Sequence, residues 1–199
     1  MRTAEHHNTA FVAGGIDRTD TKSSHALEIW QFINIFLSVL VTGVFWGSWL
    51  GLSRTMASLS PETFLEVGHA MIGNLGTIMA LLMPAAMLAT LPVLYLLFWK
   101  RSKAFYPTLA AFLLSVAALL ITLIVEVPID ILIEQWTVTS LPENWRELRD
   151  RWEVFHAIRT WISLAGFALL LAGALFNRDN TSVRRLSAES DEPIEQSLG

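Results

Sequence analysis

Two pairs of ionisable residues with the same spacing offer the clearest opportunity for chemistry in this sequence. Glu66 precedes His69 by three positions, and Glu153 precedes His156 by three positions. On a helix, side chains at i and i+3 lie on one face, so each pair can reach a common ligand. Carboxylate-bridged metal proteins of the helical-bundle class use Glu-x-x-His motifs from two helices. The spacing therefore predicts a metal site formed by these four residues.

Further charged residues come from two other positions along the chain. Glu126 and Asp130 follow one another at i and i+4, and we expect Glu126 to complete the ligand set with His69 and His156. Arg159 follows His156 by three positions in an otherwise uncharged run. An arginine at membrane depth needs a partner, and Glu126 is the partner that we predict. Arg159 is then either catalytic or purely structural, and Asp130 is a candidate base.

Three readings of this set stay open. A set of imidazole and carboxylate ligands can bind a non-haem iron, copper, zinc or manganese ion, and these ligand types do not identify which metal is bound. His69 and His156 on two helices can alternatively ligate one haem b. The third reading has no cofactor and uses a histidine or a carboxylate as a base. Because the chain has no cysteine, thiolate ligands and disulfides are excluded.

Hydrophobic helices must position these residues. The chain of 199 residues is 53% hydrophobic and 16% charged, whereas about 25% charged is usual for soluble domains. A membrane-spanning helix needs roughly 20 predominantly apolar residues. The sequence predicts an all-α, up-down bundle of four transmembrane helices embedded in the lipid bilayer. No basic patch with interleaved aromatic residues indicates a nucleic-acid partner. The predicted spans cover about 28–51, 64–99, 104–127 and 153–176.

The segments outside the spans are polar. Residues 1–25 and 178–199 are predicted to be disordered tails, which leaves 26–177 as one membrane domain. The third loop contains a charged stretch, Leu141–Arg151, that we expect to form a short interfacial helix.

Two local patterns concern helix packing and helix ends. Gly43, Gly47 and Gly51 recur at i, i+4 and i+8, which predicts a smooth face for close approach of a neighbouring helix. Ser60 followed by Pro61 is typical of a helix start.

The positive charges predict the orientation. Nine Lys and Arg residues lie in the two tails and the second loop, and four lie in the first and third loops. Because Lys and Arg are enriched in cytoplasmic segments, we expect both termini in the cytoplasm. The ionisable residues then lie toward the outer face, in an integral protein of a bacterial inner membrane.

Three short motifs resemble one family. They are Gly43-Val-Phe-Trp-Gly-Ser48, Glu126-Val-Pro-Ile-Asp130 and Trp152-x-x-x-His156-x-x-Arg159-Thr160. In their order and spacing, residues from about 28 to 176 resemble the anthrone oxygenases, which are small four-helix integral membrane proteins. The resemblance implies a monooxygenase that uses O2 to convert an activated methylene of a hydrophobic aromatic or polyketide-like molecule to a carbonyl.

The same resemblance implies roles for individual residues. His69 or His156 is a base or ligand, and Glu126 or Asp130 is a ligand or base. Arg159 stabilises the oxyanion of the deprotonated substrate.

The leading hypothesis is thus a membrane oxidoreductase whose lipophilic substrate enters from the bilayer. One alternative is a non-catalytic partner or transporter subunit with an acidic, cation-binding outer ring. The polar residues cluster at one end of the bundle rather than through its depth, which disfavours transport. A bis-histidine b-type haem redox protein is a further alternative.

The four-span topology makes a direct prediction. Reporter domains fused at Arg101, in the second loop, and at Asn144, in the third, should report opposite sides of the membrane, with Arg101 cytoplasmic. Activity of compartment-specific reporters measures this. The same side for both fusions would contradict four spans, and an exchange of the two sides would contradict only the orientation.

Overall fold

The computed structural model describes residues 5–56 and 58–190, and none of them forms a β-strand. Two short π-helical segments, η1 and η2, interrupt the α-helices. In chain order the elements are α1 (Glu5–Ser48), η1 (Trp49–Ser53), α2 (Arg54–Met56), α3 (Pro61–Trp99), α4 (Phe105–Ile121), η2 (Thr122–Glu126), α5 (Val127–Gln135) and α6 (Trp145–Ser190).

Four stretches of helix are long and apolar enough to cross a membrane, and they are Lys22–Leu52, Pro61–Trp99, Phe105–Gln135 and Trp145–Leu175. Their outward residues are apolar, with Leu81 72% and Phe32 70% exposed. Such residues lie comfortably against lipid chains, which are as apolar as leucine. The predicted all-α bundle of four membrane-spanning helices is confirmed.

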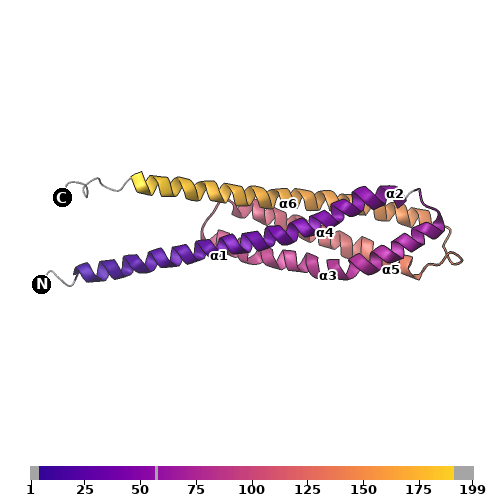
Figure 1. Ribbon diagram of the computed structural model, residues 1–199, viewed down its shortest axis with the longest axis horizontal. Helices are drawn as coiled ribbons and strands as arrows, with labels where there is room; N and C mark the ends of the chain where they lie inside the picture. The colour runs from indigo at the N-terminus through magenta and orange to yellow at the C-terminus, as the bar shows by residue number, and fades with distance from the viewer. Residues whose placement is uncertain (1–4, 57, 191–199) are drawn as a thin grey trace.

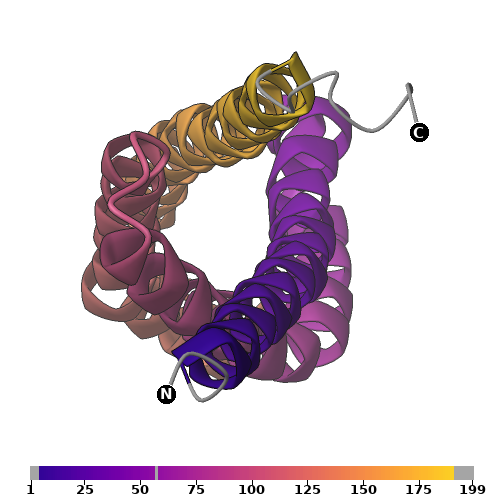
Figure 2. The ribbon, with the colours of Figure 1, turned by 90° about the vertical axis from the view of Figure 1, so that its left-hand side faces the viewer.

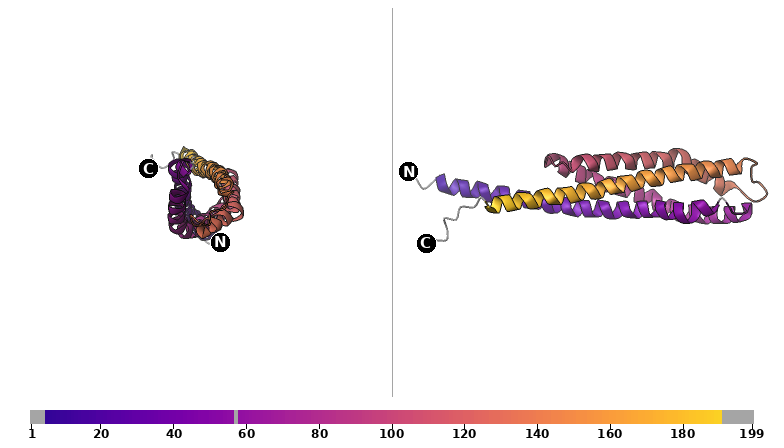
Figure 3. Two further views of the ribbon diagram at one scale, coloured as in Figure 1. Left: turned by 90° about the vertical axis from the view of Figure 1, so that its right-hand side faces the viewer. Right: turned by 90° about the horizontal axis from the view of Figure 1, so that it is seen from above.

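The helices form a closed ring in which each contacts two neighbours. α1 packs against α3 and α6, and α4 packs against the same two helices. The end-on views from both sides show this ring (Figures 2 and 3). The side view shows that α1 and α6 extend beyond the bundle at one end, whereas α2 and α5 lie at the other (Figure 1). We call the latter the α2–α5 end.

Close packing depends on glycines other than the predicted ones. A Cβ added at Gly43, Gly47 or Gly51 would meet nothing within 4 Å, so the smooth face predicted for α1 has no close neighbour there. A Cβ on Gly166 would lie 3.5 Å from the backbone oxygen of Ala111, and one on Gly173 would lie 3.1 Å from Thr108 Oγ1. These glycines allow α6 to approach α4 closely, and a Cβ added at Gly68 of α3 would lie 3.3 Å from Ile133 Cγ2 of α5.

Several boundaries differ from the sequence-based expectation. The third span continues through Pro128 to Gln135, because the π-helical segment η2 runs directly into α5, which carries the proline in its first turn. The charged stretch in the third loop is not a separate helix, because α6 begins at Trp145 and runs on without a break. Ser60 does cap α3, and its side chain accepts a hydrogen bond from the Thr63 amide.

The ends of α1 and α6 also differ from the expected disordered tails. Residues 5–25 and 178–190 are helical. Lengthening a helix that already exists needs no new nucleus, so even polar residues can extend it. The outermost parts of the predicted tails, 1–4 and 191–199, lie outside the described residues.

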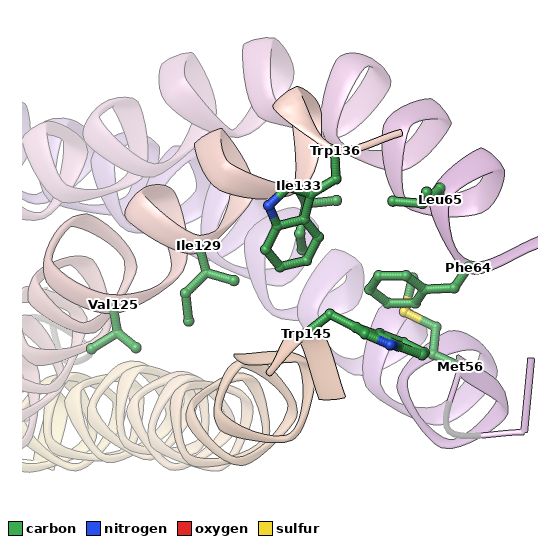
Figure 4. Close-up of a cluster of buried hydrophobic side chains, with 8 residues drawn as sticks. All are labelled: Met56, Phe64, Leu65, Val125, Ile129, Ile133, Trp136 and Trp145. Atoms are coloured by element: carbon green, nitrogen blue, oxygen red, sulfur yellow. The ribbon is translucent and has the colours of Figure 1, made fainter. Parts of the chain in front are cut away.

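A hydrophobic cluster closes the α2–α5 end of the bundle (Figure 4). Phe64 of α3 packs on Trp145 of α6, with ring centroids 5.2 Å apart. Ile133 and Ile129 of α5 are each 5% exposed and join the same cluster. The start of α3, the end of α5 and the start of α6 are thereby fixed relative to one another.

The α4–α6 contact predicts the effect of enlarging one glycine. Gly166→Leu should lower the free energy of unfolding by about 1–3 kcal/mol, because the added side chain must push α4 away. Reversible unfolding in detergent micelles measures this. Gly43→Leu is the matched control and should be tolerated, because its added Cβ meets open space. Equal effects of the two substitutions would contradict the observed packing.

Candidate functional site

The π-helical segment η2 brings a carboxylate into the bundle. It spans Thr122–Glu126 and is followed at once by α5, with Pro128 in the first turn. A π-helix widens the turn and changes the direction in which later side chains point, and such segments are frequent at functional sites. Glu126 is 1% exposed, whereas Ile124 two positions earlier is 68% exposed. A charged group therefore lies inside an apolar span.

Arg159 of α6 neutralises this carboxylate. Its Nη1 forms an ion pair with Glu126 Oε2 and donates a hydrogen bond of 2.9 Å to Thr122 Oγ1. Its guanidinium carbon lies 4.1 Å from the ring centroid of Phe45 on α1, a cation–π contact. Arg159 is 7% exposed. The ion pair predicted between Arg159 and Glu126 is confirmed.

The same guanidinium orients His156. Arg159 Nη2 lies 2.7 Å from His156 Nδ1. A guanidinium has only donors, so Nδ1 must accept, and a neutral imidazole then carries its proton on Nε2. Glu126 Oε1 is farther from Nδ1, at 3.5 Å. The buried Nε2 has no hydrogen-bond partner among the described residues. It is therefore a buried N–H donor that forms no hydrogen bond within the described part of the chain.

Trp152 packs on the face of the imidazole, whereas Thr160 bonds to the backbone of His156. The Trp152 and His156 rings stack, with centroids 4.8 Å apart and planes 6° from parallel. Trp152 Nε1 donates a 3.0 Å hydrogen bond to Asp130 Oδ1, which links the stack to α5. Thr160 Oγ1 donates to the His156 carbonyl at 2.7 Å and lies 3.4 Å from the Phe45 carbonyl on α1.

These groups form the polar wall of a cavity of about 380 Å³ between α1, α3, α5 and α6. Glu126, Asp130, His156 and Arg159 all line it. Most other lining residues are apolar. Those of α3 follow one helical face, and they are Phe64, Gly68, Met71, Ile72, Leu75, Gly76, Met79, Ala80, Met83 and Pro84. The site is suited to a hydrophobic molecule with one polar edge.

The structure does not bring the first predicted histidine into this site. His69 is not among the cavity-lining residues, and its Nε2 donates a 2.8 Å hydrogen bond to the Ile133 carbonyl. Glu66 is exposed. Both lie off the α3 face that contains Gly68 and Met71. The sequence spacing predicts a similar depth for the two Glu-x-x-His pairs, but it does not determine how α3 is rotated about its axis.

The expected metal ligands do not converge either. Among residues 5–56 and 58–190, no group of three or more His, Asp or Glu side chains is arranged to hold an ion. Glu153 is half-buried but does not line the cavity. The Arg159 guanidinium contacts both Glu126 and His156, which were expected to share a cation. Of the two histidines predicted as alternative haem ligands, His156 lines the cavity and His69 does not.

Several residues of the site were not predicted from the sequence. Arg149 lines the cavity and is 9% exposed, with its guanidinium 5.3 Å from the Trp145 ring centroid. Thr122 and Phe45 both contact Arg159. Arg149 and Thr122 have no distinctive local sequence pattern, whereas Phe45 lies within the Gly43–Ser48 motif. A further signal is the recurrence of Met71, Met79 and Met83 on the cavity face of α3, since methionine fills irregular and adaptable binding surfaces.

The fold and the site define a class of protein: a four-helix membrane protein with an apolar cavity and a buried ionised wall. Residues 67–169, more than half of the chain, match the family model of the anthrone oxygenases. The chain belongs to this family. The matched range contains Glu126, Asp130, His156 and Arg159, which line the cavity. No curated protein and no solved structure matches the chain.

The buried ion pair predicts an asymmetry between single and double substitutions. Arg159→Leu should lower the free energy of unfolding by about 3–5 kcal/mol, because it leaves the Glu126 carboxylate buried without its partner. Glu126→Gln combined with Arg159→Leu should cost less, since no charge is then left unpaired. Unfolding in detergent micelles measures both. An equal or larger loss in the double variant would contradict a buried charged pair.

Proposed function

We propose that the protein is a membrane monooxygenase that oxidises the activated methylene of a fused-ring, anthrone-like aromatic molecule to a carbonyl with O2. The proposal rests on one arrangement, a largely apolar cavity with carboxylate, imidazole and guanidinium along one wall. Membership of the anthrone oxygenase family supports the type of reaction. The size of the cavity, about 380 Å³, is within the range of about 300–1,000 Å³ that is usual for small-molecule sites.

The first step needs a base. Asp130 is the candidate, because it lines the cavity and does not share the ion pair of Glu126. Trp152 fixes one carboxylate oxygen of Asp130 through its indole N–H, which leaves Oδ2 to accept a proton from the methylene carbon. Glu126 is a poorer candidate, because one of its carboxylate oxygens is held in the ion pair with Arg159.

The second requirement is stabilisation of the resulting anion. Deprotonation of an anthrone methylene moves negative charge onto the ring carbonyl oxygen. The His156 Nε2–H can donate a hydrogen bond to that oxygen, and the neighbouring guanidinium provides a fixed positive charge. Donors fixed in advance in a site of low dielectric stabilise developing charge strongly. Arg159 acts here as a positioning residue, because it holds the tautomer and orientation of His156.

The electrons of the reaction balance with substrate and O2 alone. The carbanion reduces O2 and forms a carbon–oxygen bond, which gives a peroxide anion. The proton held by Asp130 returns to the distal oxygen. Loss of the remaining hydrogen on that carbon breaks the oxygen–oxygen bond, yields the carbonyl and releases water. One oxygen atom enters the product and the other leaves as water, without an added reductant.

This proposal predicts the effect of removing the base. Asp130→Asn should reduce kcat/KM for a dihydroxyanthrone by roughly 10²–10⁴-fold, as is typical for a lost general base. His156→Gln should reduce kcat by about 10²–10³-fold, as is typical for a lost oxyanion donor. Anthraquinone formation and O2 uptake, measured in lipid nanodiscs, should agree in a one-to-one ratio.

The controls separate enzymatic from spontaneous oxidation. Glu143→Gln, an exposed acid in the third loop, should leave the rate unchanged. Protein-free nanodiscs give the background rate. With isotopically heavy dioxygen, one labelled atom should enter the quinone. If wild type does not exceed the background, the oxygenase proposal fails and the partner-subunit alternative is favoured. If elemental analysis finds a stoichiometric metal whose removal abolishes turnover, the proposed roles of Asp130 and Arg159 are wrong.

A further inference from the structure

The exposed residues of the cavity wall all lie on one side of it. Among the described lining residues, five are exposed, and they belong to only two neighbouring stretches of helix. Gly76, Ala80 and Pro84 lie on α3, whereas Leu123 and Val127 lie on η2 and α5. The lining residues that come from α1 and α6 are buried or half-buried. The cavity is therefore open between α3 and the η2–α5 stretch.

The five residues form two stripes that flank this opening. Gly76, Ala80 and Pro84 recur at i, i+4 and i+8, so they share one face along about 12 Å of α3. Leu123 and Val127 are at i and i+4 and bracket the buried Glu126. The α3 stripe consists of small residues, and a Cβ added at Gly76 would meet nothing within 4 Å. The opening is thus wide on the α3 side and lies beside the ionised wall.

The position of the opening along the membrane-spanning helices determines whether lipid or water lies outside it. Ala80 is at the midpoint of the Pro61–Trp99 span, and Leu123 is close to the middle of the Phe105–Gln135 span. The hydrocarbon core is about 30 Å thick, so residues this far from the helix ends face lipid chains rather than water. A molecule that passes between the stripes comes from the hydrocarbon region.

We propose that the gap between α3 and the η2–α5 stretch is a lateral entrance, and that the substrate is an uncharged polycyclic molecule dissolved in the bilayer. This inference rests on the oxygenase function proposed above. A charged substrate would have to cross hydrocarbon at a cost of several kcal/mol, whereas a neutral flat ring system partitions into it. The substrate becomes an anion only after it reaches Asp130, beside the His156 and Arg159 pair. The neutral quinone product can leave by the same route.

The absence of cysteine allows a selective test of the entrance. Ala80→Cys creates the only thiol in the chain, at the middle of the α3 stripe. A bulky methanethiosulfonate reagent should then block the opening, and a reductant should restore it. The control is Gly43→Cys, which is also exposed within a span but does not line the cavity. Two quantities are measured in vesicles. The first is binding of a dihydroxyanthraquinone, which needs no turnover, and the second is the rate of oxidation of a dihydroxyanthrone.

Modified Ala80→Cys should lose both anthraquinone binding and turnover, and reductant should recover both, whereas modified Gly43→Cys should retain both. Full binding by modified Ala80→Cys would overturn the lateral entrance even if turnover by the unmodified protein supports the oxygenase. Binding that is blocked only at Ala80, in a protein that never oxidises the anthrone, would support the entrance and refute the oxygenase. No binding to the unmodified variant would overturn the entrance as well.

Discussion

One buried positive charge governs the arrangement of the site. Arg159 lies within a membrane-spanning helix and is 7% exposed. An arginine guanidinium stays protonated in proteins, so a buried one requires hydrogen-bond acceptors around it. Glu126 contributes the opposite charge, and Thr122 and His156 contribute neutral acceptors. Removal of either charged residue alone would leave its partner uncompensated in a medium of low dielectric, so the pair fixes α6 against the η2 segment.

This constraint has consequences for both shape and chemistry. Glu126 is the last residue of η2 and faces the guanidinium of Arg159. The following helix, α5, places Asp130 at the cavity, where Trp152 Nε1 of α6 donates a hydrogen bond to its carboxylate. Because Arg159 donates to Nδ1, the neutral imidazole carries its proton on Nε2, which is buried without a hydrogen-bond partner among the described residues. The charged groups are confined to one wall, and methionines and other apolar residues of α3 form the opposite side. An aromatic molecule can therefore be buried while one polar edge meets hydrogen-bond donors.

The sequence predicts the spans and the ion pair well, because both follow from the cost of burying charge. A long uncharged run is accommodated best as a membrane-spanning helix. Arg159 is the charged residue inside one such run, so it requires an opposite charge, and Glu126 is the nearest carboxylate at a similar depth. Rotation of a helix about its axis is harder to predict. His69 and His156 end matching Glu-x-x-His motifs predicted at similar depth, but of the two only His156 lines the cavity. The π-helical segment before Pro128 and the tautomer of His156 depend on tertiary contacts, which periodicity does not encode.

The central claim is that Arg159 holds His156 as a neutral imidazole with its proton on Nε2. Solid-state NMR of the protein in bilayers, with histidine labelled by the heavy nitrogen isotope, measures this directly. The signals of His156 can be assigned by their loss in His156→Gln. The account predicts an unprotonated Nδ1 and a protonated Nε2, and a loss of this uniform state in Arg159→Leu. A proton on Nδ1 of the wild-type protein, whether alone or together with one on Nε2, would contradict the account.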